Sequence, residues 1–345
     1  MKKQSPDLPP RRPTVLDVAQ LARVGASTVS RYLRGGNNVS HDVSLRVAEA
    51  VRKLGYQPDE LARGLRGGRT HTIGVIFPQT ANSFFGRCVQ MIEQEAAARG
   101  CAVILHTHNE SPELQSRQLA TLRRYRADGV ILTCAPGSDL HSLQKELTGI
   151  PLVALDRPLW DEADAVLLRN REASRMAVEH LLSHGHTAIA CITAAAHMYT
   201  FSERVAGYRE VIAGAGLREH LIVADNYEQL QGAVGRALDG RDAPTALFSL
   251  SNMATFSVLL SLTKAHHKVS RELALIGFDD VDYAPLLNPS LTTIRQPIGN
   301  LSQQAVQLLF DRILYGDKRQ PERIMLPGEL VRRHSCGCRR VDSGS

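Results

Sequence analysis

From Thr70 onward, short apolar segments alternate with longer stretches of helical periodicity, and this alternation strongly constrains the fold. The apolar segments are short enough for buried strands, and amphipathic stretches such as Phe84–Ala98 and Arg171–Ser183 lie between them. Strands that alternate with helices predict a mostly parallel α/β body. The strand candidates are Ile73–Phe77, Ala102–Leu105, Val130–Thr133, Leu152–Leu155, Ile189–Thr193, Ala246–Ser249 and Leu273–Phe278.

This body repeats itself weakly along the chain. The segment THTIGVIFP at residue 70 and the segment HTAIACITA at residue 186 each begin a strand–helix series. Later in each series, a predicted strand is followed directly by an aspartate, Asp156 in one and Asp279 in the other. Two doubly wound halves would place both aspartates at the carboxyl edges of strands, facing one cleft where ligands bind.

The first 57 residues predict three short helices instead. Thr14 can cap a first helix, the turn 23–25 separates it from a second, and Ser40 can cap a third. Within the second helix, Val29 and Leu33 form an inward-facing pair four residues apart. Two helices joined by a tight turn, with a third that completes the core, predict a helix-turn-helix domain.

The charge is unevenly distributed between these two regions. Residues 1–70 hold 13 Lys and Arg against 6 Asp and Glu, a net charge of +7, whereas the other 275 residues hold 28 and 29, a net charge of −1. A basic head on a neutral body predicts a nucleic-acid-binding protein. A solubilising tail is the alternative, but the basic residues continue well beyond residues 1–12, the segment expected to be a disordered basic tail.

Several classes of protein are disfavoured. The chain has no run of about 18 apolar residues, so no membrane span is expected, and its start lacks the apolar segment of a secretory signal. No P-loop, G-x-S-x-G, H-E-x-x-H or G-x-G-x-x-G motif stands between a predicted strand and helix. The sequence therefore predicts no enzyme activity, no catalytic residues and no cofactor.

The six cysteines indicate a reducing compartment. Four of them stand alone in apolar or helical stretches, which is typical of buried thiols in the cytoplasm. Cys336 and Cys338 could bind a metal or form a redox pair, but the spacing is not C-x-x-C and no second ligand pair lies near in sequence. His184-Gly185-His186 is interpreted as a structural turn, so no metal site is expected.

Motifs along most of the chain resemble one family of regulators. TVLDVAQLARVGASTVSRYLR, followed by RVAEAVRKLGYQPDELARGLR, resembles the headpiece and hinge of the LacI/GalR family of bacterial transcription regulators. The body is similar to that family in IGVIFPQTANSFF, ADGVILT, IPLVALDRP, VEHLLSHGHTAIACI, ERVAGYREVIAGAGL, PTALFSLSN and LALIGFDDVDYAPLLNPSLTTIRQP. The resemblance covers roughly residues 13–335, and several motifs in the family's order are far more specific than any one alone.

The resemblance implies an all-α helix-turn-helix headpiece and an α/β body with two doubly wound parallel-sheet subdomains of the periplasmic-binding-protein type. The chain should cross between these subdomains three times. The expected divisions are a disordered basic tail (1–12), a DNA-binding domain (13–58), a hinge helix or linker (59–69), and an effector-binding and dimerisation domain (70–340) with an N-subdomain (about 70–168 and 296–325) and a C-subdomain (about 169–295 and 326–340).

The resemblance also implies which residues contact DNA. Arg31 lies on the outer face of the second helix, where it could pair bidentately with guanine or only contact phosphate. Ala26 and Ser27 match specificity positions, although such small residues could instead merely allow close approach. The remaining matches are the phosphate-contacting positions Thr28, Ser30, Arg34 and Ser40 and the hinge positions Ala62 and Leu65, of which the leucine would wedge into the minor groove.

In the body, Asp156, Arg204 and Asp279 match the family's polar effector contacts. Carboxylates accept hydrogen bonds from sugar hydroxyls, and a guanidinium suits a carboxylate or vicinal hydroxyls. The alternative for each aspartate is to cap the following helix. The other effector-binding candidates, which could instead be simple core residues, are Phe84, Phe85, Met198, Thr200 and Tyr227.

The sequence departs from the family pattern near this predicted pocket. Arg169-Asn170 and Ser251-Asn252 each stand where the family has an acidic residue. Together with Arg157 and Arg204, these changes favour an anionic effector such as a sugar acid or a sugar phosphate.

The function implied by the resemblance is sequence-specific transcriptional regulation in the cytoplasm. A homodimer would repress genes of carbohydrate or sugar-acid catabolism, for example of gluconate or ketogluconate, until a small-molecule effector releases it from a near-palindromic operator. A sugar-binding protein and a corepressor-dependent regulator of the same fold are the alternatives. No leucine heptad follows Cys338, so a dimer is expected rather than a coiled-coil tetramer.

Overall fold

The computed structural model describes residues 13–33, 39–56, 69–269, 273–316 and 320–338. The chain divides into two compact units, Met1–Thr70 and His71–Ser345, and each is considered by itself. The predicted DNA contacts Arg34, Ala62 and Leu65 lie outside the described residues.

The first unit contains the three predicted helices, α1 (Val15–Ala22), α2 (Ala26–Leu33) and α3 (His41–Leu54). Their shared core is formed by small and β-branched side chains, because short helices must approach closely to exclude water. The inward position of Val29 is confirmed, since its side chain is fully buried in this core. The buried residues of the cluster are Val18, Ala19, Ala22, Val29, Val47 and Ala50.

The helix ends follow local sequence signals. Thr14 caps α1 through a capping box with Asp17, in which each side chain bonds to the other residue's backbone N–H. Arg23 ends α1 in the left-handed conformation, with a φ of 55°, which produces the tight turn before α2. Ser40 stands at the N-cap of α3 but makes no side-chain capping bond, so only its position is as expected.

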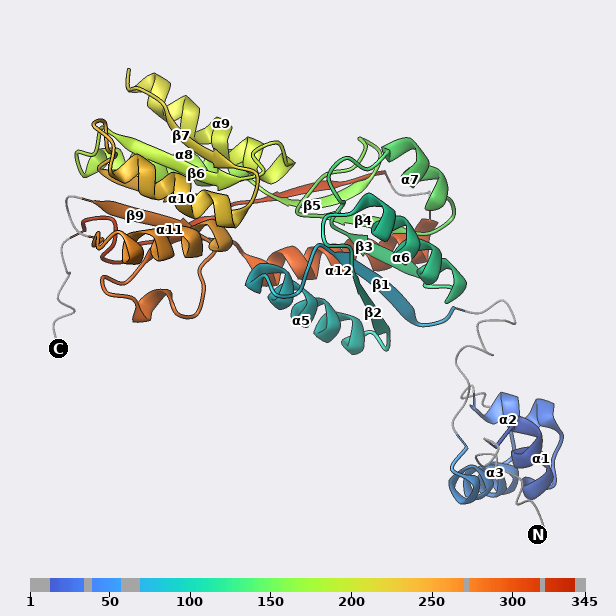
Figure 1. Cartoon of the computed structure of the whole chain (residues 1–345). Helices are drawn as coiled ribbons and strands as arrows, with labels where there is room; N and C mark the ends of the chain where they lie inside the picture. The colour runs from blue at the N-terminus through green and yellow to red at the C-terminus, as the bar shows by residue number, and fades with distance from the viewer. Residues whose placement is uncertain (1–12, 34–38, 57–68, 270–272, 317–319, 339–345) are drawn as a thin grey trace, which may run out of the picture. The chain divides into compact units, whose positions relative to one another are not determined.

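The second unit contains two six-stranded sheets, each covered by helices on both faces (Figure 1). In both sheets all strand pairs are parallel except β10 with β12. The first sheet has the order β11 (Arg323–Leu326), β5 (Asp164–Leu168), β4 (Leu152–Leu155), β3 (Gly129–Leu132), β1 (Thr72–Phe77) and β2 (Ala102–Thr107). The second has the order β12 (Glu329–Val331), β10 (Thr292–Arg295), β9 (Ala274–Phe278), β8 (Ala246–Ser249), β6 (Ile189–Ala194) and β7 (His220–Ala224).

Four helices cover each sheet, two on each face, with apolar clusters beneath them. Around the first sheet these are α5 (Ser83–Ala98) and α12 (Ile298–Tyr315) on one face and α6 (Pro112–Arg124) and α7 (Leu140–Glu146) on the other. Around the second sheet they are α8 (Asn170–Ser183) and α9 (Tyr199–Gly214) on one face and α10 (Tyr227–Leu238) and α11 (Asn252–Lys264) on the other, and a short 3₁₀ helix, η1 (Ala284–Leu286), joins the core under α11.

The two sheets have the same strand order, position by position, so the weak internal repeat of the sequence corresponds to two similar halves. The chain passes between the sheets after β5, after β10 and between β11 and β12. The predicted fold class, a helix-turn-helix headpiece with two parallel α/β subdomains, is therefore confirmed. We call the part built on the first sheet the N-subdomain and the part built on the second sheet the C-subdomain.

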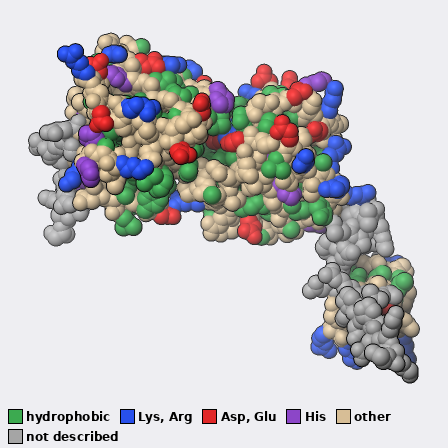
Figure 2. Space-filling view, viewed as in Figure 1, with side chains coloured by type: hydrophobic (Ala, Val, Ile, Leu, Met, Phe, Trp, Pro, Cys, Tyr) green, Lys and Arg blue, Asp and Glu red, His purple; other side chains and the backbone are tan. Residues whose placement is uncertain are grey.

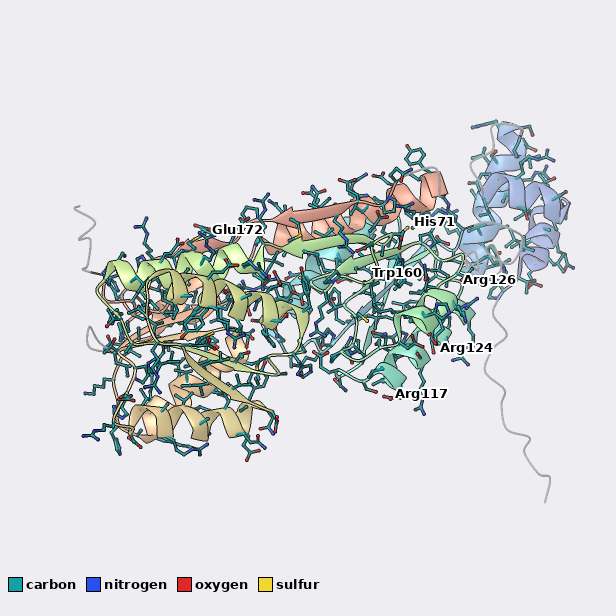
Figure 3. All side chains as sticks on the ribbon, turned by 90° about the horizontal axis from the view of Figure 1, so that it is seen from above. His71, Arg117, Arg124, Arg126, Trp160 and Glu172 are labelled. Carbon is teal, nitrogen blue, oxygen red and sulfur yellow. The ribbon has the colours of Figure 1, made fainter. Side chains whose placement is uncertain are left out.

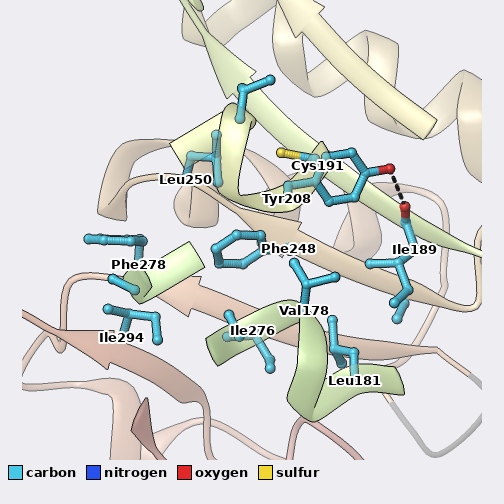
Figure 4. Close-up of a cluster of buried hydrophobic side chains, with 14 of the residues drawn as sticks. Val178, Leu181, Ile189, Cys191, Tyr208, Phe248, Leu250, Ile276, Phe278 and Ile294 are labelled. Atoms are coloured by element: carbon cyan, nitrogen blue, oxygen red, sulfur yellow. Dashed lines mark hydrogen bonds between the residues drawn. The ribbon is translucent and has the colours of Figure 1, made fainter. Parts of the chain in front are cut away.

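A close-packed apolar cluster lies between the second sheet and its helices α8 and α9 (Figure 4). Tyr208 is fully buried there, and its hydroxyl donates a hydrogen bond to the backbone carbonyl of Ile189 at 2.9 Å. This bond satisfies the one polar group that the ring carries into the core.

Figure 2 shows basic and acidic side chains interspersed with apolar ones over the visible face of the second unit. Within the described parts of the chain, no helix combines the length and apolar character needed to cross a bilayer.

Candidate DNA-binding and effector-binding sites

The exposed face of α2 is formed by Ser27 and Arg31, four residues apart and therefore on the same side of the helix. Arg31 forms no ion pair with any other described residue, so its guanidinium is available for a ligand. Thr28 and Ser30 are half-buried, and Ala26 packs in part against the headpiece core. The helix thus presents one long basic side chain among small ones.

The start of α2 has no side-chain cap because Gly25 precedes it. The Gly25 carbonyl accepts hydrogen bonds from the backbone N–H groups of Thr28, at 2.9 Å, and Val29, at 3.2 Å. Gly25 itself is exposed, so the first turn of α2 can approach another molecule closely. An uncapped helix start favours an anion such as a phosphate, because the N–H groups that precede these bonds can donate to it.

In the body, Asp156 follows β4 and Asp279 follows β9, the corresponding strand of the other sheet. Both aspartates adopt left-handed backbone conformations, with φ values of 70° and 71°. Each side chain is nearly buried, and the charge of Asp279 acts on the carboxyl group of Asp156. The sequence repeat therefore brings these two carboxylates near one another from separate subdomains.

The Asp156 carboxylate is buried but poorly satisfied. No described side chain donates a hydrogen bond to it, and its nearest basic atom is the Nε of Arg157, at 3.8 Å. Burial raises the pKa of Asp156 to about 6, although Arg157 and Arg204 act in the opposite direction. At neutral pH this group is therefore a charged acceptor without a donor, which is unusual in a protein interior and typical of a ligand site.

Arg204, on α9, is held rigidly beside the two aspartates. Its Nε donates to the Asn170 side-chain oxygen at 2.7 Å, and one terminal nitrogen donates to the Leu250 carbonyl at 2.6 Å. Its guanidinium also stacks on Phe278, 3.5 Å from the ring centroid. These contacts fix the plane of the guanidinium, and its charge acts on both Asp156 and Asp279.

Asp279 organises further polar groups. It accepts hydrogen bonds from the Gln296 side-chain nitrogen at 2.6 Å and from the Asn252 backbone N–H, the first residue of α11, at 3.2 Å. The side-chain oxygens of Asn252 and Gln296 are themselves buried without a donor among the described residues. Asp279 thus has a local structural role, and it also gathers two additional unsatisfied acceptors.

Asn252 also connects the two subdomains. Its side-chain nitrogen donates to the Asn82 side-chain oxygen and the Ser83 hydroxyl, both at 2.9 Å, at the start of α5. Arg87, one turn farther along α5, bonds to the Asp280 carbonyl and pairs with Asp282. A ligand that engages Asn252 would therefore act directly on the contacts between the subdomains.

The aromatic and neighbouring residues predicted to contact the effector differ in their burial. Phe84 and Phe85 are buried in the core of the N-subdomain, with ring centroids 5.0 Å apart, so packing accounts for much of their role. Tyr227 is half-buried at the start of α10, and its hydroxyl lies 3.5 Å from the Ser251 hydroxyl. Met198 is half-buried at the N-cap of α9, and Thr200 is buried in its first turn.

A cavity of about 530 Å³ lies beside these groups. Its lining includes Phe84, Asp279 and Gln296, but not Asp156, Arg204 or Tyr227. The candidate effector residues Asp156 and Arg204 therefore lie outside this cavity, whereas Asp279 and Gln296, whose side-chain oxygen lacks a described donor, line it.

The arginines that favoured an anionic effector are mostly engaged elsewhere. Both terminal nitrogens of Arg157 donate to the Glu110 carboxylate at 2.7 Å, so their charges cancel locally. Arg169 is half-exposed and bonds to the Met325 carbonyl and to Glu172, which projects from the outer side of α8 (Figure 3). The position of Arg157 next to Asp156 in the sequence did not reveal that its partner is Glu110, because Glu110 belongs to a distant loop.

Comparison with known proteins identifies the family. Residues 14–59 match the bacterial regulatory proteins of the lacI family, and residues 178–336 match a periplasmic binding protein-like domain. The ribose operon repressor of Escherichia coli (strain K12) is 31% identical over 335 residues, which cover 93% of this chain and 99% of that protein. This chain belongs to the LacI family. It is therefore a DNA-binding transcriptional repressor regulated by a small-molecule effector, and it is not an enzyme.

Further relatives agree with this family membership. The HTH-type transcriptional repressor PurR of Aliivibrio fischeri (strain MJ11) is 31% identical over 93% of this chain and 98% of that protein. The lac repressor dimer bound to operator and the anti-inducer ONPF shares the fold, with a TM-score of 0.85, 23% identity, and coverage of 94% and 99%. The CelR–cellobiose complex has a TM-score of 0.68 and 28% identity, with coverage of 94% and 100%.

Proposed function

We propose that this LacI-family repressor acts in the cytoplasm as a homodimer on a near-palindromic operator, and that a sugar bound at Asp156, Arg204 and Asp279 releases it. The relatives named for ribose and for cellobiose support a carbohydrate effector. The observation that carries the proposal is twofold: no described side chain donates to the Asp156 carboxylate, and the buried side-chain oxygens of Asn252 and Gln296, the residues bonded to Asp279, also lack described donors.

This chemistry favours a neutral sugar. Unpaired acceptors call for a ligand rich in donors, and sugar hydroxyls are donors that can bind a carboxylate strongly. A sugar acid is the second candidate, because the rigid Arg204 could pair with its carboxylate. It is less favoured since Arg157 is neutralised by Glu110 and an anionic ligand would face two buried carboxylates.

The signal can pass through the contacts between the subdomains. A ligand hydroxyl that donates to the free Asn252 oxygen would alter the bonds from Asn252 to Asn82 and Ser83. Ligand binding would thereby favour one arrangement of the subdomains and change the affinity of the headpieces for the operator. A corepressor would act through the same bonds with the opposite sign.

A ligand screen tests the effector class. The full-length chain is screened by thermal shift with neutral sugars, the corresponding sugar acids and sugar phosphates. Hits are then tested for operator release by fluorescence anisotropy, with an operator selected from random duplex DNA. A neutral sugar at about 100 times its Kd should stabilise the fold by about 2.7 kcal/mol and lower operator affinity. Hits restricted to sugar acids would favour the second candidate, and no carbohydrate hit would contradict the proposal.

The dimer interface is expected on α11 and the segment around η1. Phe256 and Leu260 lie on one face of α11 and are 50% and 39% exposed, while Tyr283 and Leu286 are also exposed. Neighbouring exposed apolar side chains of this size are typical of a surface covered by a partner.

A double substitution tests this interface. Phe256→Glu with Leu260→Glu should convert the dimer to a monomer in analytical ultracentrifugation. It should also weaken operator binding at least about tenfold, since the two headpieces no longer bind as one molecule. Leu140→Glu is the matched control because Leu140 is also 39% exposed but lies on α7. A double variant that remains dimeric would show that the interface lies elsewhere.

A further inference from the structure

Two histidines and two cysteines meet at the end of α8, away from the candidate effector residues. His180 lies on α8 and His184 at its C-cap, whereas Cys336 and Cys338 follow β12 near the end of the chain. Each of the four residues offers one ligand atom, and these atoms all lie within 4.8 Å of one another. The tertiary fold alone creates this cluster, since the two pairs are far apart in the sequence.

Local structure explains why the two histidines lie together and why the two cysteines lie together. His180 and His184 are four residues apart, which puts both rings on one side of the helix end, and their centroids are 4.7 Å apart. Gly337 has a φ of +85°, a conformation that allows the thiols of Cys336 and Cys338 to turn toward each other. The result is two ligand pairs of the kind that a tetrahedral metal site requires.

The distances agree with a shared metal rather than with a disulfide. The two sulfurs are 3.1 Å apart, whereas a disulfide bond is about 2.05 Å long. The Nε2 atom of His180 lies 3.2 Å from the sulfur of Cys336, and the Nε2 atom of His184 lies 3.2 Å from the sulfur of Cys338. Ligands at ordinary zinc bond lengths would be about 3.5 Å apart, so small outward shifts would accommodate the ion.

We propose that His180, His184, Cys336 and Cys338 bind one Zn²⁺ ion as a closed structural site. Two imidazole nitrogens and two thiolates form a donor set that Zn²⁺ prefers in tetrahedral geometry. Two thiolates also neutralise the charge of the ion. The hydroxyl of Thr292, on β10, lies 3.2 Å from the Cys336 sulfur and supplies the outer hydrogen bond that such ligands usually have.

The ion would fasten the end of the chain to α8. Cys336 is fully buried against the core of the C-subdomain, and the preceding Ser335 donates to the Leu275 carbonyl of β9 at 2.6 Å. The segment around Cys336 is thus already bound to the second sheet, and the metal would also link it to α8. Because binding occurs only in the folded state, it adds to the stability of the C-subdomain.

The sequence disfavoured a metal site because no second ligand pair lies near the two cysteines in the sequence, but the structure brings such a pair to them. The spacing C-x-C without a second ligand pair nearby is weak evidence for metal, and His184-Gly185-His186 is a turn as expected. The missing pair is His180 with His184. His186 is not part of the site, because its ring is buried and lies 3.2 Å from the Thr245 hydroxyl.

Metal analysis of the untagged full-length protein tests the proposal. After chelator treatment and dialysis with ZnCl₂ under reducing conditions, mass spectrometry of the elements should find one zinc ion per chain. Cobalt substituted for zinc should give the visible bands of tetrahedral Co²⁺ and a thiolate-to-cobalt charge-transfer band. Zinc should raise the thermal unfolding midpoint of the apo-protein.

Variants at the rim of the site make the test specific. His184→Ala with Cys338→Ala should lose the zinc and the thermal shift while staying folded by circular dichroism, because neither residue is fully buried. The matched control His141→Ala with Cys101→Ala changes one histidine and one cysteine outside the cluster and should keep both. Zinc content well below one per chain, zinc retained by the rim variant, or a disulfide between Cys336 and Cys338 under reducing conditions would each overturn the proposal.

Discussion

Replacing Asp156 by Asn should make the repressor much less sensitive to its effector while leaving operator binding intact. The Asp156 carboxylate is a buried charged acceptor with no described donor, so a bound sugar hydroxyl would be its partner. Hydrogen bonds to charged groups contribute about 1.5–3 kcal/mol, so release should require about 10- to 100-fold more effector. Titration of the operator complex with the effector, followed by fluorescence anisotropy, measures this change.

The same variant should be more stable without ligand. Burial raises the folded-state pKa of Asp156 to about 6, above the unfolded value of 3.8, so the ionised carboxylate destabilises the fold above pH 6. That penalty is relieved as the pH falls from 6 toward 4, and Asn removes it at every pH. The gain at pH 7 should be about 1–2 kcal/mol, since Arg204 loses a counter-charge at the same time.

Asp225→Asn is the matched control for Asp156→Asn. Asp225 also follows a strand directly, β7, but its side chain is exposed. The control should keep the effector response and the stability of the parent chain. An Asp156→Asn variant that responds to effector like the parent would remove this residue from the site, and a loss of stability would mean that its charge has a structural partner.

Replacing Arg31 by Ala should abolish most of the preference for the operator over random DNA. Arg31 is the one long basic side chain on the described exposed face of α2, whereas its neighbours there are small. A bidentate contact between arginine and guanine contributes about 1–3 kcal/mol of discrimination, and a dimer would use two copies. The ratio of operator to random-DNA affinity should therefore fall at least tenfold.

The comparison variant for Arg31 is Arg52→Ala, which removes an exposed arginine from the end of α3 in the same domain. It should leave the affinity ratio unchanged. If Arg31→Ala instead weakens binding to both DNAs equally and lowers the slope of log affinity against log salt concentration by about two for the dimer, the residue contacts phosphate and does not read a base. Competition binding at two salt concentrations distinguishes these outcomes.

A strand could be predicted wherever the hydrophobic pattern of its own segment is sufficient to identify it. The apolar segments of β1, β3 and β4 were found because buried parallel strands are continuous apolar runs, and β2 was found because it begins with four apolar residues although it lies at a sheet edge. The edge strands β7, β11 and β12, which contain no buried residue, were missed, as was β10, whose sequence TTIR has a single apolar residue. β5 was also missed, because it begins with Asp164, whose charge is paired with Arg312 of α12.

Only some residues of the candidate site could be predicted, because the others depend on contacts between distant segments. Asp156, Arg204 and Asp279 were selected as candidates, and the fold brings their charges together. The orphan acceptors of Asn252 and Gln296 were not anticipated, because the amide nitrogens of these side chains bond to residues of other segments, and those bonds fix where the oxygens lie.

The sequence by itself determined the helix-turn-helix headpiece, the alternating strands and helices of the body and the repeat that pairs Asp156 with Asp279. These depend on periodicity, caps and turns, which act over a few neighbouring residues. Only the tertiary structure decided that Arg157 is neutralised by Glu110 and that His180 and His184 meet Cys336 and Cys338. Contacts between distant segments have no signal in either segment alone, because they arise when the sheets and helices pack.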